Sequence, residues 1–154
     1  MLSGHGGVVI GSEMSGSVRK VTISNCVFDG TDRGIRMKST RGRGGIVEDI
    51  RVSNIVMNNI RKEALVFNLK YSRMPEEPKS DRTPVFRNIH VSGVTVVGVQ
   101  TPIMIVGLEE APISDIVLRD IHIKDAKQPC VFKDCKNIKM DDVVVDGKEI
   151  KELE

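Results

Sequence analysis

The sequence of 154 residues contains no tryptophan, one tyrosine and four phenylalanines. Aromatic platforms for stacking nucleic-acid bases are therefore scarce, which argues against a nucleic-acid partner. A bound sugar would rely on ion pairs and hydrogen bonds. No apolar run reaches the ~20 residues that cross a bilayer, and the opening MLSGHGG lacks a signal-peptide pattern. We expect a soluble chain with no membrane partner, and its location stays open.

The chain also has few cysteines and almost no net charge. The three cysteines, Cys26, Cys130 and Cys135, show no CxxC spacing, so the sequence predicts no zinc site and no other metal site. Cys130 and Cys135 flank one expected strand, too far apart for a disulfide. We therefore predict three buried, reduced thiols. The 23 basic and 21 acidic residues nearly cancel, so overall charge points to neither nucleic acid nor membrane.

Short alternating apolar segments recur along the whole chain. The first residues of five such segments are 29, 39, 27 and 22 positions apart, which is typical of a solenoid with variable loops. The segments are VTISNCVF from Val21, IRVSNIVM from Ile50, IHVSGVTV from Ile89, IVLRDIHI from Ile116 and IKMDDVVV from Ile138.

A second series of short strands lies between the first, and each repeat of the first series carries a residue that tolerates a bent backbone. The second series starts at Val8, Gly34, Ala64, Pro102 and Pro129. The bending residues are Asn25, Asn54, Gly93, Asp120 and Asp142. A chain that bends and returns at each repeat coils, so the pattern predicts an all-β fold: a right-handed parallel β-helix of about five coils, forming one domain over residues 1–154.

One basic segment stands out from the balanced charge. Five cations and no acid lie between Arg33 and Arg43. Strand alternation directs Ile35 and Met37 into the core and leaves Arg36 and Lys38 facing solvent. A solvated strand face would look the same, but the glycines around these cations let a ligand approach closely. We interpret the segment as one wall of an anion-binding groove.

Neighbouring coils add polar residues to this groove. His5 leads into the strand at Val8, one coil before Arg36 and Lys38, although a histidine between glycines can also be a simple turn residue. In the following coil, Leu65, Phe67 and Leu69 take the core positions, so the outward ones are left to Asn68, Lys70 and Tyr71. Three stacked coils would thus present a polar groove that suits a chain-like anion.

These residues resemble family 28 of the glycoside hydrolases, the polygalacturonases and their bacterial exo-acting relatives. The resemblance covers essentially the whole chain and matches the C-terminal half of that family. Gly4-His5-Gly6 is similar to the family's histidine motif, and Arg36-Met37-Lys38 to its Arg-Ile-Lys motif. The resemblance implies inverting hydrolysis of α-1,4-galacturonan without a cofactor. It places His5 beside the catalytic centre, Arg36 and Lys38 on a uronate carboxylate, and Tyr71 on the sugar.

The catalytic carboxylates of that family are expected to be missing, because they precede the histidine motif. Inverting hydrolysis needs an acid and a base carboxyl group roughly 6.5–9.5 Å apart. Asp141-Asp142 matches the family's Asp-Asp pair only by its letters, four coils from His5. Asp29 and Asp32 lie in FDGTDRG, which we interpret as a turn.

Three hypotheses follow. We favour a fragment, truncated at its N-terminal end, that keeps part of the uronate-binding groove, binds galacturonate weakly and is inactive by itself. The alternatives are a half-enzyme completed by a separate N-terminal chain, and a non-catalytic scaffold or anion-binding module. The unpaired edges of the first coil also predict a homo-oligomer formed through that coil.

Overall fold

The computed structural model describes residues 1–71 and 76–151. Within these ranges the chain forms β-strands and no helix. The strands are β1 (Val8–Ile10), β2 (Val18–Asp29), β3 (Ile35–Lys38), β4 (Ile46–Asn68), β5 (Val85–Val106), β6 (Ile113–Ala126), β7 (Val131–Lys133), β8 (Cys135–Val145) and β9 (Lys148–Glu149).

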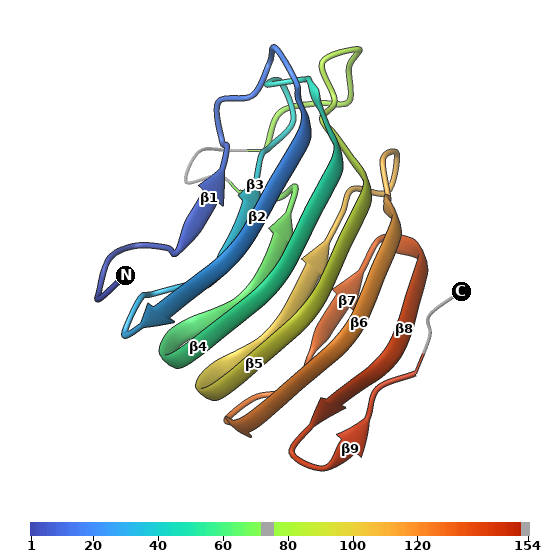
Figure 1. The fold of residues 1–154 in the computed structure, drawn as a ribbon. Helices are drawn as coiled ribbons and strands as arrows, with labels where there is room; N and C mark the ends of the chain where they lie inside the picture. Colours follow the sequence, from blue (N-terminus) through green and yellow to red (C-terminus); the bar gives the residue numbers. More distant parts are fainter. Residues whose placement is uncertain (72–75, 152–154) are drawn as a thin grey trace.

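The strands stack in parallel from one end of the molecule to the other. β2, β4, β5, β6 and β8 pair in that order along one side, as Figure 1 shows. On another side β1 pairs with β3, β3 with the end of β4, β4 with the end of β5, and β5 with β7. Only β9 runs antiparallel, against β8. The two predicted series are therefore confirmed as two columns of strands in a right-handed parallel β-helix.

β4 and β5 are long because each bends through several sides of the coil without a loop. The five predicted bending residues all have positive φ, from 52° to 65°, and lie in register at one corner. Two further corners were not predicted. One contains Lys20, Asp49, Asn88, Asp115 and Asn137, and the other contains Gly30, Asn59, Gly98 and Asp125. Asn, Asp and Gly predominate because they adopt the left-handed conformation at low cost.

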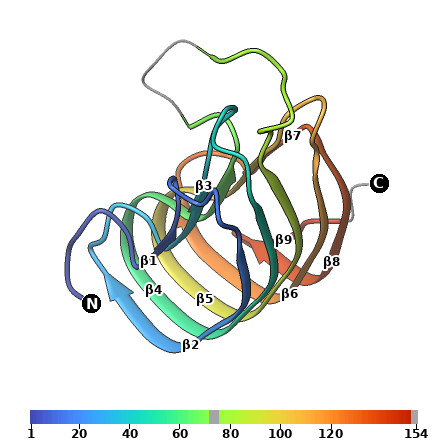
Figure 2. The ribbon, with the colours of Figure 1, turned by 90° about the horizontal axis from the view of Figure 1, so that it is seen from above.

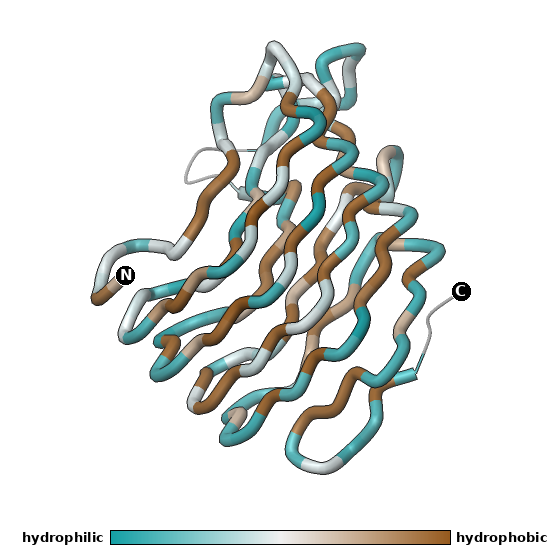
Figure 3. The backbone as a smooth tube through the Cα atoms, viewed as in Figure 1, coloured by the Kyte–Doolittle hydropathy of each residue, from teal (hydrophilic) through white to brown (hydrophobic). Residues whose placement is uncertain are grey.

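Aliphatic side chains fill the inside of the coils. One column consists of Ile23, Val52, Val91, Leu118 and Met140, which share a register and are all buried. Figure 2 looks along the stack and shows the coils overlapping around this common interior. Figure 3 shows hydrophobic and hydrophilic residues alternating along the strands. The alternation explains why the strand pattern could be recognised in the sequence.

The three cysteines differ in part from the prediction. Cys26, Cys130 and Cys135 are free, but each is half-buried rather than fully buried as predicted. Cys26 lies in β2 and Cys135 in β8, the first and the last parallel strand of their column. Burial raises the pKa of Cys130 and Cys135, which keeps both thiols protonated.

The described residues include no helix long and apolar enough to cross a membrane. Self-association through the first coil stays a prediction.

Candidate functional site

A cleft of about 610 Å³ lies over β3 and the neighbouring coils. All six residues that the sequence placed in the groove line it: His5, Arg36, Lys38, Asn68, Lys70 and Tyr71. The remaining lining residues are Asp32, Arg33, Lys62, Glu63 and Val66.

β3 positions the two central cations. Ile35 and Met37 are buried in the core, so Arg36 and Lys38 project outward on the same side of the strand. In the parallel register Arg36 lies beside Val66, and Lys38 beside Asn68. Val66 is covered although it points outward, and it forms an apolar patch of the cleft floor. The cleft therefore combines two cations with an amide and an apolar surface.

Three stacked turns form the end of the cleft nearest β1. The Asp32 amide donates to the Gly4 carbonyl at 2.8 Å, and the Lys62 amide donates to the Asp32 carbonyl at 2.8 Å. This ladder brings His5, Asp32 and Lys62 onto neighbouring rungs. The His5 side chain is 98% exposed, with Nδ1 3.2 Å from Asp32 Oδ2. This hydrogen bond, helped by Arg61, lowers the pKa of Asp32.

Most cations of the basic segment find acidic partners elsewhere in the chain. Arg33 Nε lies 2.6 Å from Glu63 Oε2, Arg41 pairs with Glu76 and Glu110, and Arg43 pairs with Glu13. The sequence showed only that no acid lies within this segment, and partners from distant loops cannot be recognised locally.

Arg36 and Lys38 differ from these paired cations. No ion pair among the residues that the structure describes joins either of them to a carboxylate. The Arg36 Cζ lies 5.1 Å and the Lys38 Nζ 4.3 Å from the centre of the Tyr71 ring, within the range of cation–π attraction.

These two cations were predicted to be solvent-exposed, and they are exposed only in part. Both residues are half-buried, and the Tyr71 ring lies next to both cations. Burial, together with the nearby Arg33, lowers the pKa of Arg36. A partly desolvated guanidinium without a carboxylate partner is well suited to receive an external anion.

Some functional candidates were missed and others are excluded from the cleft. Asp32 closes a turn through its backbone, as predicted, but its side chain also faces the cleft. Asp29 instead accepts a hydrogen bond from Asn59 at 3.2 Å. Asp142 lies at a corner, with Oδ2 3.0 Å from His122 Nε2. Glu63 and Lys62 could have been identified by counting one coil on from Arg33 and Asp32.

One group outside the cleft has the atoms of a metal site. The ligand atoms of Asp120, His122 and Asp142 lie within 4.8 Å of one another, and all three residues are exposed. Asp120 and Asp142 are corner residues of β6 and β8, and His122 follows the corner on β6. None of the three lines the cleft. The cleft itself contains one histidine and two carboxylates, and each carboxylate contacts an arginine: Asp32 contacts Arg61, and Glu63 contacts Arg33.

Comparison with known proteins identifies the family. The sequence model described as Glycosyl hydrolases family 28 matches residues 1–148. An exopolygalacturonase from Thermotoga maritima superposes with a TM-score of 0.88 at 33% identity, covering 97% of this chain and 32% of that one. A family 28 exopolygalacturonase from Yersinia enterocolitica has the same fold, with a TM-score of 0.67 at 23% identity, covering 97% of this chain and 30% of that one.

Sequence relatives agree with the structural ones. An endo-polygalacturonase of Pectobacterium carotovorum is 41% identical over 64 residues, which are 42% of this chain and 15% of the relative. A probable polygalacturonase of Vitis vinifera is 28% identical over 138 residues, which are 85% of this chain and 28% of the relative. The chain thus spans about a third or less of the length of these relatives. It belongs to family 28 of the glycosyl hydrolases.

Proposed function

We propose that this chain provides the part of a galacturonan hydrolase that holds the acidic sugar, with Arg36 and Lys38 binding a uronate carboxylate. One observation carries the proposal: two half-buried cations stand side by side in a cleft, with no ion pair to a described carboxylate. The printed names of the relatives, polygalacturonases from bacteria, fungi and a plant, agree with an acidic sugar polymer.

The cleft offers a distinct role to each polar residue. The Arg36 guanidinium can bind a carboxylate through two parallel hydrogen bonds, and the Lys38 ammonium adds a second positive charge. Asn68 and Tyr71 can hydrogen-bond sugar hydroxyls. Because the Tyr71 ring lies over both cations, it also fixes the direction from which a carboxylate approaches. His5 lies at the rim, where it can contact the sugar next to the bound uronate.

The carboxyl groups of the cleft do not suit the acid and base roles of inverting hydrolysis. Inverting hydrolysis needs a protonated carboxyl group for the leaving oxygen and an ionised one for water. Asp32 is held in its ionised form by His5 and Arg61, so it is unsuited to donate a proton. Glu63 is committed to Arg33. We therefore propose that the described residues bind substrate but lack the acid–base pair, and that the chain by itself does not hydrolyse polygalacturonate.

A titration of trigalacturonate, followed by NMR, tests the binding proposal. We expect a dissociation constant of about 1 mM that weakens as salt is added. Arg36→Ala and Lys38→Ala should each weaken binding by about fivefold or more. Arg82→Ala removes an exposed arginine from a loop outside the cleft and should leave binding unchanged.

Two outcomes would contradict the proposal. A neutral galactose trisaccharide that shifts the same resonances equally would show that carboxylates are not recognised. Release of reducing sugar from polygalacturonate by the purified chain, lost in His5→Ala, would show that the acid–base pair is present after all.

A further inference from the structure

A second group of cations lies on the side of the coil formed by β2, β4, β5, β6 and β8. A hollow of about 170 Å³ is lined there by two arginines, a histidine and two serines, and no carboxylate is among its lining residues. The lining residues are Arg51, Val52, Ser53, His90, Val91, Ser92, Val117 and Arg119. We name the polar set Arg51, Ser53, His90, Ser92 and Arg119 the β5 patch.

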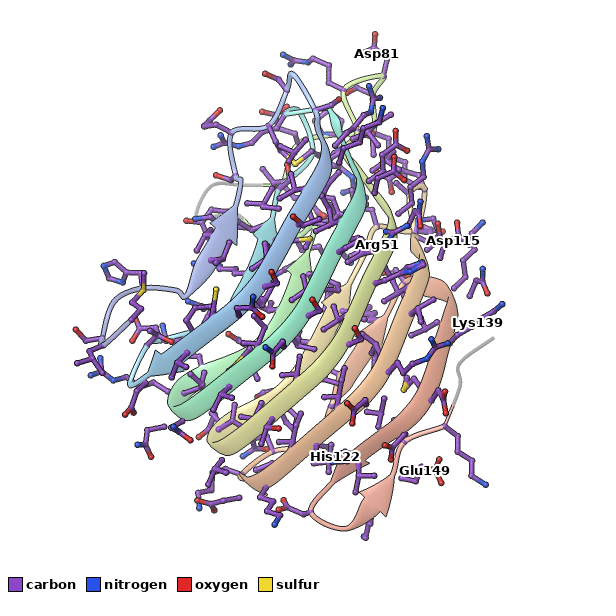
Figure 4. All side chains as sticks on the ribbon, viewed as in Figure 1. Arg51, Asp81, Asp115, His122, Lys139 and Glu149 are labelled. Carbon is purple, nitrogen blue, oxygen red and sulfur yellow. The ribbon has the colours of Figure 1, made fainter. Side chains whose placement is uncertain are left out.

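The parallel register builds this patch. Val52, Val91 and Leu118 are buried, so the residues on either side of each point outward. Arg51 lies beside His90 on the next rung, while Ser53 lies beside Ser92 and Ser92 beside Arg119. His90 and Ser92 therefore lie between the two arginines. Figure 4 shows Arg51 and Lys139 toward the beginning of these strands and His122 toward their far end.

Both arginines remain available to a ligand. Arg51 donates Nη1 to the carbonyls of Ile50 and Asn88 at 3.0 and 3.1 Å, and Nη2 to Asn88 Oδ1 at 3.3 Å. These acceptors are uncharged, so they fix the position of the guanidinium group without neutralising its charge. Arg119 Nε lies 3.4 Å from Asp141 Oδ2, a contact between two largely exposed side chains. Such an exposed pair contributes little energy and can be exchanged for another anion.

The charges around His90 come from several strands. Arg51 and Asp49 belong to β4, Arg119 and Asp115 to β6, and Lys139 to β8. Asp49 and Asp115 accept hydrogen bonds from the corner residues Asn88 and Asn137. Burial, then Arg51, then Arg119 lower the pKa of His90. Both guanidinium groups are thus close enough to disfavour a positive imidazole, as they would favour a negative ligand.

We propose that the β5 patch binds an oxyanion, either the carboxylate of an acidic sugar or an inorganic oxyanion of the sulfate type. The two guanidinium groups supply charge, and the serine hydroxyls and the imidazole N–H supply further donors. The corner residues Asn54 and Asn59 turn the chain between this patch and the cleft. The patch is therefore a separate site, and the proposal does not depend on the proposed function of the cleft.

The three histidines of the chain allow one NMR experiment to test the patch. Their ring resonances are followed against pH in sodium chloride, in sodium sulfate and in digalacturonate, all at equal ionic strength. Because a bound anion stabilises the imidazolium, we expect the pKa of His90 to rise by up to about one unit in sulfate or digalacturonate relative to chloride. A rise in both identifies a general oxyanion site, and a rise only in digalacturonate identifies an acidic-sugar site.

The other histidines serve as internal references. His122 lies between Asp120 and Asp142 and should not respond to anions. His5 reports on the cleft, so failure of the proposed function would be seen there and not at His90. If the pKa of His90 were the same in chloride as in sulfate and digalacturonate, the proposal would be overturned.

Substitutions in and around the β5 patch test which residues cause the response of His90. Arg119→Gln and Arg51→Gln should each weaken oxyanion binding by about tenfold. Of the two, only Arg51→Gln also removes hydrogen bonds to backbone carbonyls. Asp141→Asn releases Arg119 and should strengthen binding about twofold. Arg82→Gln is the matched control away from the patch. An unchanged His90 response in both Arg51→Gln and Arg119→Gln would refute the site.

Discussion

The corners of the coil and the cleft use the same stacking geometry for opposite purposes. At the corners, polar side chains on adjacent rungs satisfy one another: Asn54 Nδ2 donates to Asn25 Oδ1 at 2.7 Å, and Asn88 and Asn137 donate to the aspartates of neighbouring rungs. In the cleft, Arg36 and Lys38 form no ion pair with a described carboxylate. Polar groups satisfied within the chain stabilise the coil, whereas groups without a partner are available to a ligand.

This comparison separates stability from binding, and mutations can test the separation. Core and corner changes should lower the free energy of unfolding, while changes in the cleft should affect binding with little cost in stability.

The largest effect is expected in the core under the cleft. Phe67 is fully buried and stacks between Met37 and Ile105 in the register. Phe67→Ala should lower the free energy of unfolding by about 3–5 kcal/mol, because the lost contacts leave a cavity that the rungs cannot fill. Urea denaturation measures the change. Val56→Ala, at an outward and exposed position on the same strand, should cost less than about 1 kcal/mol, and an equal loss in both variants would contradict this assignment of the core.

A corner change should have an intermediate effect that divides into two parts. Asn54 has a φ of 55° and hydrogen-bonds Asn25. Asn54→Gly keeps the backbone conformation and loses the hydrogen bond, which should cost about 1 kcal/mol. Asn54→Ala adds the strain of a left-handed alanine, about 1 kcal/mol more. Denaturation of the two variants side by side checks the difference, and Gly93 at the same corner shows that glycine is accepted there. Equal stability of the two variants would contradict a role of backbone conformation.

The sequence was sufficient to predict the coil because inward positions must be apolar on every rung. Strand alternation correctly placed Ile35 and Met37 in the core and Arg36 and Lys38 outside it, and the repeat spacing brought Asn68 and Tyr71 to the same cleft. Two corners escaped notice because a single Asn or Asp also fits ordinary turns. The pairing of Arg33 with Glu63 and of Arg41 with Glu110 depends on how rungs and loops meet in space, and local sequence does not contain that information.

The ion pair between two loops should have a smaller, pH-dependent effect. Arg41 donates Nε and Nη2 to the two carboxylate oxygens of Glu110, at 2.5 and 2.9 Å. These bonds lower the pKa of Glu110 from 4.5 to about 2. A lowered carboxyl pKa stabilises the fold above the ordinary pKa, and that stabilisation is lost as the pH falls from 4.5 toward 2.

Arg41→Gln should therefore lower the free energy of unfolding by a small amount at neutral pH, because an ion pair that solvent can reach is weaker than a buried one. The difference from the wild type should shrink through this pH window and vanish near its lower end. Urea midpoints at a series of pH values measure it. A difference that stays constant with pH would mean that Arg41 acts through packing and not through the charge of Glu110.

The smallest effect on stability is expected where the effect on binding is largest. Burial and the neighbouring Arg33 lower the pKa of Arg36, which means that the fold disfavours this charge. Arg36→Gln relieves the repulsion and keeps most of the side chain, so the free energy of unfolding should change by less than about 0.5 kcal/mol, in either direction. Trigalacturonate binding should weaken about fivefold or more in the same variant. Arg36→Gln could instead lower the free energy of unfolding as much as a core substitution does. Arg36 would then stabilise the coil, as the corner residues do, and the cleft would lose its main candidate for carboxylate binding.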